Sequence, residues 1–143
     1  MKKIITFLLV LIVLVTFTSC GNKSIQDYDE YCYKLNQIIK DIDFDKGVIQ
    51  YGMISLLKDD EIVFETTFAE YDKRYEIKYI RKEDNRIFYV LNSSHGDDEG
   101  IVFINGNTNS VMDGLYYLER ISGNSYKYKT YKWFFIPILI WRM

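Results

Sequence analysis

The chain has 143 residues and a formal net charge of −2, with 48% hydrophobic and 27% charged residues, which is the composition of a single globular domain. It contains one proline but thirteen tyrosines and nine phenylalanines, so the composition favours strands and argues against a disordered linker. Removal of Met1–Ser19 would leave sixteen basic and twenty acidic residues. Such a mildly acidic domain gives no electrostatic reason to expect a nucleic-acid partner.

The first nineteen residues have the pattern of an export signal. Lys2 and Lys3 form a basic start, and the fourteen residues from Ile4 to Phe17 are apolar except for two threonines. That length suits the core of a signal peptide and falls short of the roughly twenty residues that a spanning helix needs. Cleavage as an ordinary signal and retention as an uncleaved anchor helix are two interpretations of this pattern.

The apolar run ends in Phe17-Thr18-Ser19-Cys20. This segment resembles the lipobox of bacterial lipoprotein precursors, in which an apolar residue and two small residues precede an invariant cysteine; Phe17 stands where leucine is usual. The resemblance is confined to residues 1–23 and implies a lipid thioether on Cys20 and cleavage just before it. Because two or three acyl chains anchor a protein stably, we expect an extracytoplasmic lipoprotein, held to a membrane at the cell surface or in a periplasm.

Lipidation would consume one of the two cysteines and leave Cys32 unpaired. Cys32 falls on an apolar helical stripe, where a buried cysteine behaves as a small hydrophobic residue; a reactive thiol or an intermolecular disulfide is the alternative. Residues 21–23 form a tether that reaches only about 10 Å when fully extended. We therefore expect the domain to sit close to the bilayer.

The segment from Ser24 to Asp43 is predicted to be a helix. Apolar residues recur at steps of three and four along it, at Ile25, Tyr28, Cys32, Leu35, Ile39 and Ile42. This spacing produces one continuous apolar face. Ser24 and Asp27 have the spacing of a capping box at the start. Packing of the stripe on a sheet is the expected use, and a coiled-coil seam is the alternative.

From Val48 onward the pattern is typical of strands separated by polar turns. Apolar and polar residues alternate most clearly in Lys73–Arg81, with Tyr75, Ile77 and Tyr79 on one face. This alternation indicates a sheet with one buried face and one solvent-exposed face. The seven predicted strands are Val48–Leu57, Ile62–Ala69, Lys73–Arg81, Arg86–Asn92, Ile101–Ile104, Leu115–Ile121 and Tyr126–Trp133. The segment Ser93–Gly100 is predicted to be a polar loop.

These elements predict an α+β fold, in which one N-terminal helix packs on an antiparallel β-meander of about six or seven strands. The order of elements is cystatin-like, which is an analogy without a shared motif. The domain organisation is a signal peptide at 1–19, a lipidated cysteine and tether at 20–23, and a single domain at 24–143 with an apolar C-terminal segment at 133–141.

His95 is the one histidine and the one candidate base. It lies beside Asp97, Asp98 and Glu99, which suggests a metal site or a general base as one hypothesis and a solvated loop as the other. A zinc site needs further histidine or cysteine ligands, and a calcium loop needs regularly spaced oxygen ligands. We therefore expect no cofactor and no metal, and an enzyme is the less favoured class.

Two segments near the C-terminus have unusual composition. Residues 126–132 alternate tyrosine with lysine, which fits either a half-buried strand or a surface that stacks on sugars or binds acidic polymers. The nine apolar residues that follow have a tryptophan at each end, a feature of membrane-interface segments. The residues proposed for membrane or partner contact are Trp133, Phe134, Phe135 and Trp141. A buried terminal strand is the favoured interpretation of this run, and membrane or partner contact and a disordered or artefactual end are the alternatives.

The sequence shows no pattern of a known active site, so we expect a non-catalytic binding module for a protein or a cell-envelope component. A binder of a small apolar ligand or lipid, with a cavity between helix and sheet, is the second hypothesis. An enzyme that uses His95 is the third.

Overall fold

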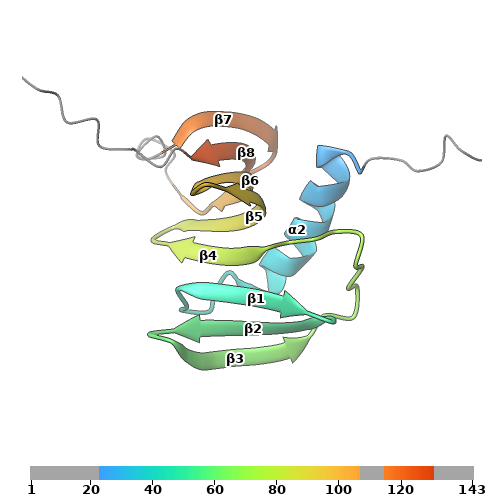
Figure 1. Cartoon of the computed structure of the whole chain (residues 1–143), viewed down its shortest axis with the longest axis vertical. Coiled ribbons are helices and arrows are strands. Elements are labelled where there is room, and N and C mark those ends of the chain that lie inside the picture. The colour runs from blue at the N-terminus through green and yellow to red at the C-terminus, as the bar shows by residue number, and fades with distance from the viewer. Residues whose placement is uncertain (1–22, 107–114, 131–143) are drawn as a thin grey trace, which may run out of the picture.

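The computed structural model describes residues 23–106 and 115–130, which form one helix and one antiparallel sheet of eight strands (Figure 1). The described part is therefore an α+β unit with eight strands, where six or seven were predicted. The elements are α2 (Ile25–Ile39), β1 (Lys46–Gln50), β2 (Met53–Lys58), β3 (Glu61–Thr67), β4 (Tyr79–Glu83), β5 (Arg86–Ser94), β6 (Asp97–Ile104), β7 (Leu115–Ser122) and β8 (Ser125–Thr130).

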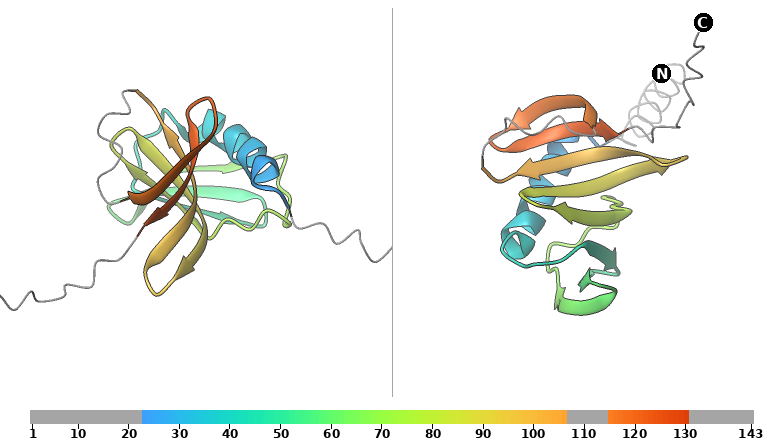
Figure 2. Two further views of the ribbon diagram at one scale, coloured as in Figure 1. Left: turned by 90° about the horizontal axis from the view of Figure 1, so that it is seen from above. Right: turned by 90° about the vertical axis from the view of Figure 1, so that its left-hand side faces the viewer.

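The strand order across the sheet is β3-β2-β1-β4-β5-β6-β8-β7. Five pairs of consecutive strands are hairpins with two-residue turns. The order differs from a simple meander at two places, because β4 returns beside β1 and β8 lies between β6 and β7. The strands β3 and β7 are consequently the two edges. Seen from above in Figure 2, β7 and β8 (orange and red) run across the direction of β1, so the sheet is strongly twisted.

The helix begins as predicted. The Ser24 hydroxyl accepts from the Asp27 amide, and the Asp27 carboxylate accepts from the Ser24 amide at 2.9 Å, which completes a capping box. The helix ends at Ile39, four residues before the predicted end at Asp43. The Lys82 ammonium donates to the carbonyls of Lys40 and Ile42, so a sheet residue satisfies the backbone where the helix stops.

Two predicted segments are wrong where a two-residue turn joins two strands. The predicted strand Val48–Leu57 is two strands, joined at Tyr51 (φ 50°) and Gly52 (φ 82°). The predicted loop Ser93–Gly100 is mostly strand, because β5 and β6 meet at His95 (φ 53°) and Gly96 (φ 91°). Paired positive φ values are those of the tightest hairpin turns.

The predicted strand Lys73–Arg81 begins only at Tyr79. The chain before it makes turns, with the Tyr71 amide bonded to Phe68 and the Tyr75 amide bonded to Asp72. Tyr75 nevertheless packs inward, stacked on Tyr31 at 4.5 Å between ring centroids. The alternation therefore indicated burial correctly and secondary structure wrongly.

The core has two parts, on opposite faces of the sheet. The larger cluster joins buried helix residues with one face of the sheet, and its fully buried members include Cys32, Leu35, Ile39, Ile54, Leu56, Ile80, Tyr89 and Ile101. The smaller cluster is formed by Phe88, Val102, Ile104 and Tyr128. Because β5 pairs Phe88 with Val102 and Tyr89 with Ile101, successive residues face the two clusters in turn.

Candidate functional site

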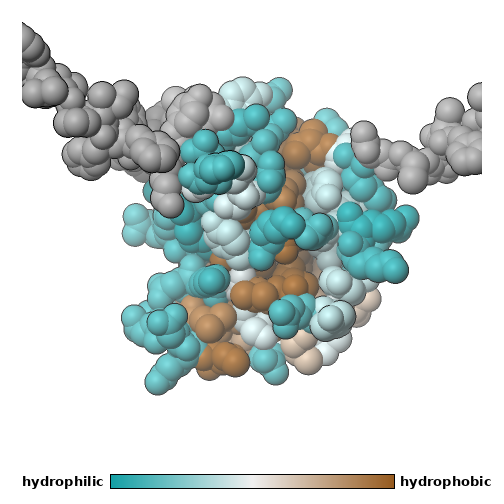
Figure 3. All heavy atoms as spheres, viewed as in Figure 1, coloured by the Kyte–Doolittle hydropathy of each residue, from teal (hydrophilic) through white to brown (hydrophobic). Residues whose placement is uncertain are grey.

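The edge of the sheet that β3 forms carries the most exposed aliphatic side chains of the described residues. Ile62 and Val63 on β3 are 62% and 48% exposed, and Tyr51 at the β1–β2 turn is 96% exposed. Figure 3 shows brown, hydrophobic atoms at the lower edge of the molecule, where β2 and β3 lie. A single exposed apolar residue needs no explanation, but adjacent ones on an edge strand do.

A bulge accounts for the exposure of neighbouring residues on β3. The pairing steps from Leu56–Phe64 to Leu57–Ile62, so Val63 has no partner in β2. One extra residue turns the strand locally and disturbs the alternation of faces. Ile62 and Val63 therefore both reach solvent at the start of this edge.

The same edge is strongly acidic. From Asp59 to Asp72 the chain carries six carboxylates and no lysine or arginine. Those of Glu70 and Asp72 form ion pairs, with Lys34 at 3.1 Å and with Arg74 at 2.5 Å. Hydrogen bonds from Arg74 lower the pKa of Asp72 to about 2.

The other four carboxylates belong to Asp59, Asp60, Glu61 and Glu65, and within residues 23–106 and 115–130 none of them forms an ion pair. Glu65 accepts from the Ser55 hydroxyl at 2.9 Å. The exposed start of β3 is thus both apolar and negatively charged.

A shallow groove continues from the end of β3 to the helix. It is lined by Tyr33, Lys34, Gln37 and Ile38 of α2 and by Thr67, Phe68, Ala69 and Glu70. The Lys34–Glu70 ion pair spans it. Phe68 is buried, while Tyr33 and Ile38 are 52% and 38% exposed, so the wall formed by the helix offers apolar surface to solvent.

The opposite edge, β7, is tied to the helix. The Ser122 hydroxyl donates to the buried Asp29 carboxylate at 2.7 Å. No hydrogen bond between α2 and β3 is recorded within the described residues. The two edges of the sheet therefore differ in their hydrogen bonding to the helix.

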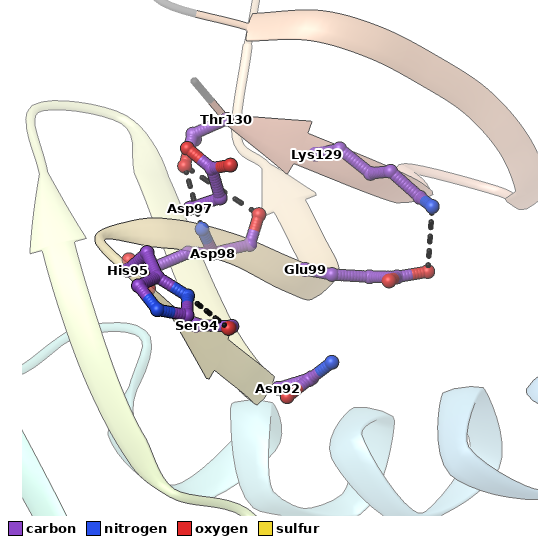
Figure 4. A pocket seen from close by; sticks show the side chains of 8 residues that line it. All are labelled: Asn92, Ser94, His95, Asp97, Asp98, Glu99, Lys129 and Thr130. Carbon is purple, nitrogen blue, oxygen red and sulfur yellow. Dashed lines mark hydrogen bonds and ion pairs between the residues drawn. The ribbon is translucent and has the colours of Figure 1, made fainter. Parts of the chain in front are cut away.

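The His95 turn brings together the residues that the sequence suggested, but it does not turn them toward one point (Figure 4). The Ser94 hydroxyl lies 2.9 Å from His95 Nδ1. Asp98 accepts from the Tyr79 hydroxyl at 2.6 Å, whereas Glu99 points away toward Lys129 at 3.3 Å. Among the described residues, no three metal-ligand side chains gather.

The alternating tyrosine and lysine residues lie on β8. Tyr128 is fully buried and Tyr126 is half-buried against the smaller core cluster. Lys127 and Lys129 both pair with Glu99, at 3.6 and 3.3 Å. The described part of this segment is thus a strand with tyrosines packed on one face, and Tyr128 is not available to stack on a sugar.

Cys32 is a free, fully buried cysteine, as the helical stripe predicted. Burial raises the pKa of its thiol well above the ordinary value, which disfavours the reactive thiolate. The remaining predicted sites, namely Cys20, Trp133, Phe134, Phe135 and Trp141, lie outside the described residues.

Sequence reasoning did not single out Ile62, Val63, Glu61 or Glu65. The sequence does contain one signal for this surface, namely the acidic run from Asp59 to Asp72. Its position on an edge depends on the strand order.

The described residues form an α+β unit with one helix and an antiparallel sheet of eight strands. Within the described residues no helix is long and apolar enough to cross a membrane. No protein-family model, curated protein or solved structure matches the chain.

Proposed function

We propose that this chain is a membrane-anchored, extracytoplasmic lipoprotein whose domain is a non-catalytic binding module for a protein or a cell-envelope component. The location rests on the sequence of residues 1–20, where a basic start and a fourteen-residue apolar core lead to Thr18-Ser19-Cys20. Lipid on Cys20 supplies the anchor, and the three-residue tether keeps the domain near the bilayer.

One observation favours binding as the activity of the domain: the exposed, bulged and acidic edge strand β3. The unpaired backbone groups of an edge strand attract other strands, and the bulge and the carboxylates of β3 limit which strands can pair with it. In this proposal the helix packed on the sheet, in cystatin-like order, is a support that holds β3 in place. The His95 turn supports catalysis less well, because Glu99 is held by lysines and Asp98 is bonded to Tyr79.

The experiment compares wild type with Cys20→Ala and with Cys32→Ala as the matched control. We expect wild type and Cys32→Ala to incorporate labelled palmitate and to remain in the membrane fraction after a salt wash. Cys20→Ala should lose the label and become extractable, because only a covalent acyl chain holds the protein. If Cys20→Ala stays as firmly bound as wild type, lipid is not the anchor.

The same three proteins test the binding role through crosslinking in the membrane followed by mass spectrometry. We expect one dominant partner that is captured by wild type and Cys32→Ala and is lost with Cys20→Ala. Capture of no enriched protein would count against an interaction module.

A further inference from the structure

We propose that the β3 edge binds an extended, basic polypeptide segment, which adds to the sheet as a further strand beside β3. This inference rests on the proposed binding function and names the surface and the chemistry of the partner. Within the described sheet, β3 pairs only with β2, so the backbone groups on its other side are free to pair. Strand addition obtains affinity from such groups and specificity from the flanking side chains.

Charge determines which kind of segment fits. Asp59, Asp60, Glu61 and Glu65 form no ion pair within the described residues. A partner with lysine or arginine residues would supply counter-charges, since opposite charges on neighbouring strands attract. A second copy of β3 would bring carboxylates against carboxylates, which is unfavourable. The edge therefore fits a basic partner better than its own copy.

Apolar contacts complete the recognition. Ile62 and Val63 offer side chains at the start of the edge, and Phe68, Tyr33 and Ile38 line the groove near its end. A partner strand that alternates basic and apolar residues presents one kind to each face. The register with β2 places Ile62 and Glu65 on one face of β3 and Glu61 on the other. We infer that the partner's apolar side chains lie against Ile62 and Val63, while its cations on the other face meet Glu61.

The probe is a fluorescent synthetic peptide of about eight residues, a usual strand length, which alternates lysine and valine. The matched peptide has glutamate in place of lysine. Both are titrated against the lipidated protein purified in detergent, by fluorescence anisotropy. We expect the lysine peptide to bind, the glutamate peptide not to bind, and the affinity of the lysine peptide to fall as salt screens the charges.

Two variants locate the site. Glu61→Lys combined with Glu65→Lys should weaken binding of the lysine peptide by about tenfold or more, because attraction becomes repulsion. Glu119→Lys reverses one charge on β7, the opposite edge, and should leave the affinity within about twofold, since exposed charges beyond a Debye length are screened. All of these side chains are exposed, so the variants should fold, which circular dichroism checks.

Hydrogen exchange distinguishes strand addition from loose electrostatic attraction. Bound lysine peptide should slow exchange of backbone amides within residues 61–67. Equal binding of both peptides, equal binding by the Glu61/Glu65 variant, or unchanged exchange in β3 would overturn the proposal. Slower β3 exchange at high protein concentration without peptide would assign the edge to a second copy and would also overturn it.

Failure of this inference is separable from failure of the proposed function. A photo-crosslinking residue is placed at Ile62 on β3 or at Tyr117 on β7 in the membrane-bound protein. Capture of the same partner from Tyr117 but not from Ile62 would preserve the binding function and reject the β3 edge as its site.

Discussion

At the scale of single residues, two buried tyrosines provide a matched pair. The Tyr128 hydroxyl is buried and has no hydrogen-bond partner among the described residues, while its ring meets Phe88 edge-on at 5.0 Å. The Tyr89 hydroxyl is equally buried but donates to Asn36 Oδ1 at 3.2 Å. The two side chains therefore have the same chemistry and burial but opposite hydrogen-bond satisfaction.

We expect Tyr128→Phe to raise the free energy of unfolding by about 1 kcal/mol, because it removes a buried hydroxyl that forms no bond. Tyr89→Phe should lower it by about 1–2 kcal/mol, since it leaves the buried Asn36 amide oxygen without its donor. Urea unfolding at neutral pH measures both. A loss of stability in Tyr128→Phe similar to that in Tyr89→Phe would show that the Tyr128 hydroxyl has a partner.

The burial of Tyr128 also predicts how the stability of the folded protein depends on pH. Burial raises the pKa of Tyr128 above its ordinary value of 10.0. A raised pKa in the folded state means that the stabilising contribution is complete below about pH 10 and is lost as the pH rises above it. The stability of wild type should therefore decline above pH 10, and Tyr128→Phe should decline less steeply.

At the scale of elements, the β1–β2 turn contains a residue that its backbone disfavours. Tyr51 has φ 50° and is 96% exposed, and Asn-Gly is the pair that such a turn prefers. We expect Tyr51→Asn to raise the free energy of unfolding by about 0.5–1 kcal/mol, because asparagine tolerates left-handed φ with less strain. Tyr51→Val, with a β-branched side chain, should lower it. Thermal unfolding followed by circular dichroism compares the three proteins.

The helix start and three of the five hairpin turns could be predicted from the sequence because their signals are local. Ser24 and Asp27 show the capping box, and Asp59-Asp60, Asp84-Asn85 and Gly123-Asn124 stand between apolar runs. The turn at Tyr51 was missed because its flanking residues continue the strand pattern. The strand ends on either side of His95 were missed because their residues are polar, which is typical of a loop. A local pattern does not reveal that Tyr51 and His95, which are not glycines, adopt positive φ.

The strand order and the candidate edge could not be predicted in the same way. The return of β4 beside β1 leaves β3 at the edge, and this choice depends on long-range contacts. Tyr75 and Ile77 alternate as strand residues do, yet they pack from a turn segment against the helix side of the core. Alternation reports which side chains are buried and leaves the backbone partners undetermined.

At the scale of the whole molecule, buried contacts extend across both faces at the centre of the sheet. Ile87–Val90 of β5 and Ile101–Ile104 of β6 are buried at every position. The edge strand β3 has no buried residue. A rigid centre with an open edge is the arrangement that presents a binding strand without disturbing the core.

If the helix and the sheet form one cooperative unit, Leu35→Ala should destabilise the sheet as much as the helix. Leu35 is fully buried in the cluster that also contains Ile54 of β2 and Ile101 of β6. We expect the substitution to lower the free energy of unfolding by about 3 kcal/mol, through lost burial and a residual cavity. Native-state hydrogen exchange should then quicken by the same factor at the slowest amides of α2, β2 and β6, because these amides exchange only through global opening. Ile38→Ala, on the exposed side of the same helix, should change stability by less than about 1 kcal/mol. Faster exchange confined to α2 would mean instead that the sheet is stable without the helix, in which case the β3 edge is held by the sheet alone.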